Sequence, residues 1–117
     1  MENKEIKQAI GTLTPEEIQR LKAQNGRVYE ITATDDGETH VAYFRRPDMQ
    51  TLAAMTKIAK TDEIKASQIL MEGCFLAGSE LMKKDTALFV ATVAQLSKVV
   101  ASVRATLKNV LRSSPSP

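Results

Sequence analysis

Aromatic residues are scarce in this chain. Its 117 residues include no Trp, three Phe and two Tyr, together 4% of the sequence. The hydrophobic core must therefore rest on Leu, Ile, Val, Met and Ala, a composition that suits helix packing. Long apolar runs are also missing, and no stretch of about 18 apolar residues could span a membrane. With 43% hydrophobic and 26% charged residues, the composition predicts one soluble globular domain.

Cysteine and histidine each occur once, as Cys74 and His40. A single Cys excludes an intrachain disulfide framework and fits a reducing compartment. A single His cannot build a zinc site of the usual spacing, so we predict a packed or exposed strand His, no bound metal and no cofactor. Cys74 has apolar neighbours and is predicted to be a buried, unreactive thiol. The N-terminal residues do not resemble a signal peptide, and we expect a cytoplasmic protein.

The motifs of common enzyme active sites are missing as well. The sequence contains no phosphate-binding Gly loop, no nucleophile elbow and no coherent pair of acid and base. Asp35, Asp36 and Glu38 lack the alternating oxygen ligands and terminal Glu of a calcium loop, so turn formation is sufficient to explain them. We therefore predict no enzymatic activity and no catalytic residue.

Acidic residues are absent from the C-terminal quarter of the chain. Residues 1–85 contain all 14 acidic side chains and 12 basic ones, whereas the residues from Thr86 onward contain four basic side chains and no acid. Such an asymmetry points to interaction with a partner more than the net charge of +2 does. The four basic residues are Lys98, Arg104, Lys108 and Arg112.

Capping signals predict four helices. Thr-Pro-Glu-Glu at residues 14–17 is a capping box with Pro at the first helical position, and Asn-Gly at 25–26 is a left-handed end signal. Arg-Pro-Asp at 46–48 and Thr-Asp-Glu at 61–63 begin two further helices. We predict helices at 14–25, 47–60, 62–72 and 85–112, and a loose helix at 2–10. Residues 73–78 are a buried apolar connector, and 113–117 a disordered tail.

Between the first two of these helices the pattern changes to a period of two, which predicts a β-hairpin at residues 27–45. The pair Asp36-Gly37 tolerates the positive φ of a tight turn. A lone hairpin is only marginally stable, so its apolar face should pack on helices. The predicted fold is a single α+β domain over residues 1–112, mainly helical, with one hairpin packed on a helical bundle and a long C-terminal helix. The apolar face consists of Tyr29, Ile31, Ala33, Ala42 and Phe44, with Tyr29 opposite Phe44 and Ile31 opposite Ala42.

The C-terminal helix carries an apolar ladder. Its members are 4, 3, 4, 3, 4 and 3 residues apart, the spacing of a and d positions in a coiled coil. No Pro or Gly interrupts residues 85–112, which predicts a continuous helix roughly 40 Å long at about 1.5 Å per residue. A domain of this size is only about 25–30 Å across, so the helix should extend beyond the core. The ladder is formed by Phe89, Val93, Leu96, Val100, Val103, Leu107 and Val110.

Three interpretations of this helix stay open. It can be a core helix with a solvated basic flank, since the basic residues lie in the sector next to the ladder. It can also present an apolar seam with a basic rim to an acidic helical partner or to a second copy of the chain. The third interpretation is nucleic-acid binding by the basic stripe together with Arg45 and Arg46, beside Tyr43 and Phe44. Four cations on a mixed surface are few for that role, so nucleic acid is the least favoured partner.

Four short segments occur in order between Lys22 and Leu96. They are Lys-x-x-x-Gly-Arg-Val-Tyr-Glu-Ile at 22–31, Ala-Tyr-Phe-Arg-Arg-Pro-Asp at 42–48, Ile-Lys-Ala-Ser-Gln-Ile-Leu at 64–70 and Gly-Cys-Phe-Leu-Ala-Gly-Ser-Glu at 73–80. In their order and spacing these segments resemble small tail assembly chaperones of long-tailed bacteriophages and prophages, especially those with a Tyr-Phe-Arg-Lys/Arg-Pro element entering a helix. The resemblance covers about two thirds of the chain.

The resemblance implies a non-catalytic protein with protein partners. Such chaperones bind the long, helix-rich tape measure protein and keep it soluble until the tail tube polymerises around it. They are thought to recruit tail tube subunits, and they are not retained in the virion. The implied partners are the tape measure protein and the major tail protein, and the implied location is the host cytoplasm. A structural subunit of the tail stays open as an alternative.

The family has no catalytic residues to carry over, so the apolar ladder alone supplies the predicted contact surface. An exposed seam can cover the apolar stripes of a helical client, and a polar rim keeps such binding reversible. The predicted strip consists of Leu96, Val100, Val103, Leu107 and Val110, with Arg104 and Lys108 as its rim.

Overall fold

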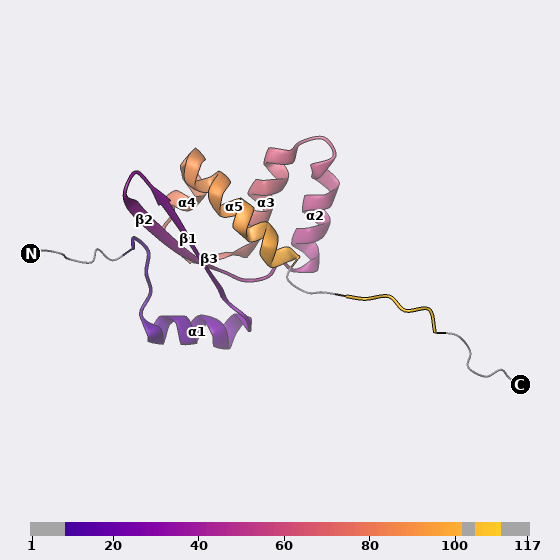
Figure 1. Ribbon diagram of the computed structural model, residues 1–117, viewed down its shortest axis with the longest axis horizontal. Helices are drawn as coiled ribbons and strands as arrows, with labels where there is room; N and C mark the ends of the chain where they lie inside the picture. Colours follow the sequence, from indigo (N-terminus) through magenta and orange to yellow (C-terminus); the bar gives the residue numbers. More distant parts are fainter. Residues whose placement is uncertain (1–8, 102–104, 111–117) are drawn as a thin grey trace, which may run out of the picture.

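A computed structural model of the protein describes residues 9–101 and 105–110. Within these residues the fold is α+β and mainly helical, as the sequence predicts, with helices packed against a three-stranded antiparallel sheet (Figure 1). The predicted helix at 2–10 and the predicted disordered tail at 113–117 fall almost wholly outside the described residues. The elements are α1 (Pro15–Asn25), β1 (Tyr29–Asp35), β2 (Glu38–Phe44), α2 (Met49–Ala59), α3 (Glu63–Cys74), β3 (Phe75–Gly78), α4 (Leu81–Lys84) and α5 (Thr86–Val100).

The hairpin forms in the predicted register. Asp36 and Gly37 have φ angles of 52° and 78°, and two consecutive positive φ values match the twist of a tight hairpin turn. Ile31 lies opposite Ala42, and Tyr29 lies opposite Phe44. The apolar face therefore points into the core, where Phe44 is fully buried.

The apolar connector after α3 is a strand, which the sequence prediction missed. β3 pairs with β2, and a register shift occurs between Tyr43 and Phe44. Gly78 makes the close approach of the two strands possible, because it has a φ of 124° and a Cβ at this position would lie 2.4 Å from the Cα of Ala42. Four residues without alternation carry little strand signal, and their pairing partner lies about thirty residues earlier in the chain.

The sheet is the middle layer of the molecule. One face carries the hairpin's apolar residues and packs against α3, α4 and α5, where the core contains Leu70, Met71, Met82 and Leu96. α1 has no buried residue and lies on the far side of the sheet from α5 in Figure 1, and Ile10 of the segment before it bonds to the backbone of β2. The isolated bridge from Ile10 to His40 fixes this segment to β2.

Side-chain caps begin the predicted helices. Thr14 Oγ1 accepts a hydrogen bond from Glu17 N–H, and Glu17 Oε1 accepts one from Thr14 N–H, which completes the capping box of α1. Asp48 and Asp62 cap α2 and α3 in the same way, with distances of 2.8 and 2.9 Å to the backbone nitrogens that donate. Hydrogen bonding to the Thr51 N–H lowers the pKa of Asp48. Among the described residues, no helix is long and apolar enough to cross a bilayer.

Candidate protein-binding surface

The helix that carries the apolar ladder is α5, and it is capped by Asp85, whose Oδ2 accepts a hydrogen bond from Leu88 N–H at 3.1 Å. Its buried residues are Leu88, Thr92, Leu96 and Val99, which follow each other at spacings of 4, 4 and 3. This stripe faces β1, α3 and α4 and overlaps the predicted ladder only at Leu96. The ladder residues Phe89 and Val93 are half-buried at the edge of the core. The first part of the ladder is therefore core packing.

Leu96 is wrongly placed in the predicted contact strip. Its side chain is fully buried in the core, so no partner can reach it without unfolding the helix. Val100 ends α5 and is 38% exposed, in keeping with a position at the border of a contact surface. The predicted strip residue Val103 and the rim residue Arg104 lie outside the described residues.

The prediction of one helix over residues 85–112 is wrong in its second part. α5 ends at Val100, and residues 105–110 form neither helix nor strand. Leu107 is 98% exposed and Val110 is 78% exposed. Lys108 is exposed between them. The heptad spacing does not produce a helix at residues 105–110 because no part of the described fold covers the apolar stripe. Short helices without burial are marginal in water.

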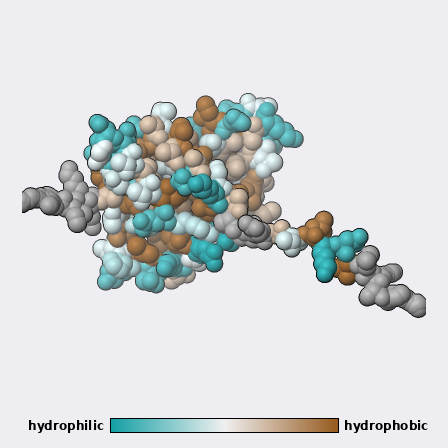
Figure 2. All heavy atoms as spheres, in the orientation of Figure 1, coloured by the Kyte–Doolittle hydropathy of each residue, from teal (hydrophilic) through white to brown (hydrophobic). Residues whose placement is uncertain are grey.

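The segment 105–110 stands apart from the folded body. Figure 1 shows it, in yellow, beyond the end of α5 and away from the sheet. Figure 2 shows hydrophobic and hydrophilic atoms side by side in it. The segment contains one basic residue and no acid. It thus offers two exposed apolar side chains and a positive charge, features that suit an apolar partner with acidic residues nearby.

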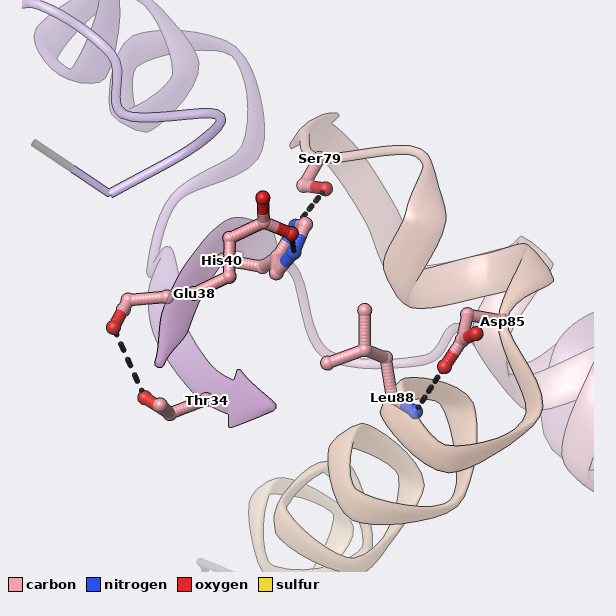
Figure 3. A network of polar contacts seen from close by, with 7 residues as sticks. Thr34, Glu38, His40, Ser79, Asp85 and Leu88 are labelled. Atoms are coloured by element: carbon pink, nitrogen blue, oxygen red, sulfur yellow. Dashed lines mark hydrogen bonds and ion pairs between the residues drawn. The ribbon is translucent and has the colours of Figure 1, made fainter. Parts of the chain in front are cut away.

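A buried polar network surrounds His40 on β2 (Figure 3). His40 is 1% exposed, and its Nδ1 and Nε2 atoms lie 2.8 Å from Ser79 Oγ and 3.0 Å from Glu38 Oε1. Because a carboxylate oxygen only accepts, Nε2 carries a proton toward Glu38, and in the neutral ring Nδ1 then accepts from the Ser79 hydroxyl. The prediction left a packed and an exposed strand His open, and the structure shows a packed one. Its partner Ser79 was missed, because a residue 39 positions away leaves no local signal.

This Ser–His–Glu contact links β2 to the turn before α4 inside the fold. The Ser79 side chain is buried, and Gly11 lies against the backbone of the same residue, where an added Cβ would be 2.4 Å from Ser79 N. The hydrogen bonds give partners to polar groups of His40 and Ser79 that would otherwise be buried without them.

The remaining candidate side chains also serve the fold. Arg45 Nε donates to the Gly73 carbonyl at 3.0 Å, and its NH2 group lies 3.6 Å from an Asp48 oxygen. Arg46 Nε donates to the Tyr29 hydroxyl at 3.0 Å. Both arginines thus hold the strand end to neighbouring elements. Cys74 is buried, as predicted, and burial raises the pKa of its thiol to about 11; its low reactivity stays a prediction. The described residues contain no cluster of metal-binding side chains.

Comparisons with known proteins support the fold and assign no activity. No known protein family matches the chain, and no curated protein matches it. Among solved structures, the chain is similar to an uncharacterised protein from Bacillus stearothermophilus, with 26% sequence identity and a TM-score of 0.57. The match covers 79% of this chain and 99% of that one. This likeness supports the mainly helical α+β fold, which another protein shares over nearly its whole length.

Proposed function

We propose that this protein is a non-catalytic tail assembly chaperone of a long-tailed bacteriophage or prophage. In this role it binds the tape measure protein and keeps it soluble in the host cytoplasm until the tail tube assembles. The single observation that carries the proposal is the exposure of Leu107 and Val110 in a segment without regular structure. The four sequence segments between Lys22 and Leu96 that resemble such chaperones supply the identity of the client.

The proposed contact surface consists of Val100 at the end of α5 and of Leu107, Lys108 and Val110 in the exposed segment 105–110. Apolar side chains of this kind can cover the apolar stripe of a helical client. The interface would be small, which fits a chaperone that must release its client. Recruitment of the major tail protein to the same complex is part of the proposal. The nucleic-acid alternative has less support, because Tyr43 and Phe44, which it requires for base stacking, are buried.

Co-expression with the tape measure protein of the same phage or prophage tests this function. We expect the chaperone to raise the soluble fraction of the client, measured by quantitative gel analysis after centrifugation. Leu107→Asp plus Val110→Asp should abolish the gain, because two charges replace the exposed apolar side chains. The matched control is Thr106→Asp plus Asn109→Asp, which adds the same charge to the same segment and should retain most of the gain.

Two results would contradict the proposal. If the Leu107 and Val110 double variant protects the client as well as the unchanged protein does, the exposed segment is not the contact surface. If mass spectrometry detects the protein in purified virions at the level of a tail subunit, it is a structural component of the particle and not a chaperone. Sequencing of the genes on either side provides a further check, since a tape measure gene should lie nearby.

A further inference from the structure

A surface groove runs between α3 and the segment formed by α4 and α5. Two adjoining hollows of about 430 and 340 Å³ form it and share Gln68, Lys83 and Phe89 in their walls. We call it the α3–α5 groove. It lies along the first turns of α5, whereas the exposed segment 105–110 follows the last turn. The two surfaces are therefore at opposite ends of α5.

The groove presents apolar side chains to solvent. Ile64 at the start of α3 is 70% exposed, and Val90 on α5 is 61% exposed. Ile69 and Phe89 are half-buried between them. Isolated apolar residues are common on protein surfaces, but four that line one continuous depression form the kind of site into which a partner helix inserts its apolar stripe.

The charged residues that line the groove are three lysines and Glu72. Lys65 stands on the α3 side and Lys84 on the α4 side. Within the described residues neither lysine forms an ion pair. Lys83 differs, because it lies 3.1 Å from Glu80 and 3.8 Å from Glu72 and covers the ring of Phe75. Two uncompensated positive charges thus stand on opposite walls of an apolar depression.

We propose that the α3–α5 groove binds an amphipathic helix of another protein whose apolar stripe is bordered by Asp or Glu. The apolar stripe would fill the depression, and the carboxylates would meet Lys65 and Lys84. The chain's own segment 105–110 does not fit this description, since it contains a lysine and no acid. The inference goes beyond the proposed function, because it concerns a different surface and does not depend on a tape measure client.

Binding of a labelled synthetic peptide to the full chain tests this inference. The probe is a three-heptad helix with Leu at the a and d positions and Glu beside them, and the comparison peptide has Lys in place of each Glu. Fluorescence anisotropy should show binding of the acidic peptide only, and binding should weaken as salt is raised, because exposed charges are screened. Lys65→Glu plus Lys84→Glu should weaken binding by about tenfold or more.

Matched variants separate the groove from general charge effects. Lys57→Glu on α2 plus Lys60→Glu directly after it changes the net charge equally, outside the residues that line the groove, and should alter affinity by less than about twofold. Val90→Asp should weaken binding, whereas Met49→Asp, at an exposed apolar position on α2, should not. Leu107→Asp plus Val110→Asp should leave peptide binding unchanged. Circular dichroism checks that each variant is folded.

Three outcomes would overturn the inference: equal weakening by the two lysine pairs, equal binding of the basic peptide, and loss of binding on changing Leu107 and Val110. Sedimentation supplies a fourth, because a dimer that Val90→Asp dissociates would show that a second copy occupies the groove. A protein that binds the acidic peptide but does not solubilise the tape measure protein contradicts the proposed function and leaves this inference standing.

Discussion

α5 and the segment 105–110 continue the same apolar ladder, yet only α5 is helical. Both regions have apolar residues at heptad spacing and no Pro or Gly. They differ in what lies beside them, since α5 packs on β1 and α4, whereas the side chains of residues 105–110 are exposed. The comparison teaches that periodicity identifies residues able to share one face of a helix, and burial decides whether the helix forms.

The largest difference in stability between the two regions should appear when a Leu is shortened to Ala in each of them. Leu96→Ala opens a cavity in the core and should lower the free energy of unfolding by about 2–5 kcal/mol. Leu107→Ala should change it by less than about 0.5 kcal/mol, because the side chain is exposed. Urea unfolding followed by circular dichroism measures both values. Similar losses for the two variants would show that Leu107 is packed in solution.

Proline substitutions test directly which of the two regions has a helical backbone. Ala94 is an exposed position inside α5, and Ala105 is exposed outside it. Ala94→Pro should cost about 3 kcal/mol or more, because it removes a helical hydrogen bond and clashes with the preceding turn. Ala105→Pro should leave the unfolding midpoint and the helical signal unchanged. A clear loss of helix signal in Ala105→Pro would mean that α5 extends through this residue in the free protein.

A smaller loss of stability is expected when the cap at the start of α5 is removed. Asp85→Ala removes the side chain that caps Leu88 N–H and should reduce stability by about 1 kcal/mol. Asp85→Asn retains a capping oxygen and should retain most of the stability. Thermal unfolding of the two variants tests the difference. Equal losses would assign the effect to the charge of Asp85 and not to its cap.

The last prediction concerns the rate at which the Cys74 thiol reacts with a thiol reagent. Its thiol pKa is raised to about 11 by burial, so the thiol stays protonated at pH 8 and should react slowly with a thiol reagent in the native state. Leu96→Ala should speed the reaction, because it loosens the core around the thiol, whereas Leu107→Ala should not. Absorbance of the released reporter measures the rate. Rapid labelling of the unchanged protein would contradict the burial of Cys74.

Local features of the fold could be predicted from the sequence. The hairpin register follows from Asp36-Gly37, because a two-residue turn determines which residues face each other. Helix starts follow from caps that lie within a few residues of the groups they bind. In contrast, β3 pairs with a strand about thirty residues earlier, and Ser79 meets His40 across 39 positions, so neither contact leaves a local signal.

The exposure of the proposed contact strip was predicted only in part. The exposed positions of Val100, Leu107 and Lys108 agree with it, and so does that of Val110, but Leu96 belongs to the core. The ladder spacing could not separate these cases, since the buried stripe of α5 runs from Leu88 to Val99 and is rotated from the ladder. The α3–α5 groove was not predicted, because its residues come from helices that tertiary packing brings together.

By itself the sequence determined the starts of α1, α2, α3 and α5, but not of α4, together with the hairpin and its apolar face and a C-terminal part rich in apolar and basic residues. These features depend on neighbours within a few positions. The tertiary structure alone decided where α5 ends, which of its apolar residues are buried, and that a third strand completes the sheet. The physical reason is that apolar side chains stabilise a helix or strand only where another element removes them from water, and the position of that element is not encoded locally.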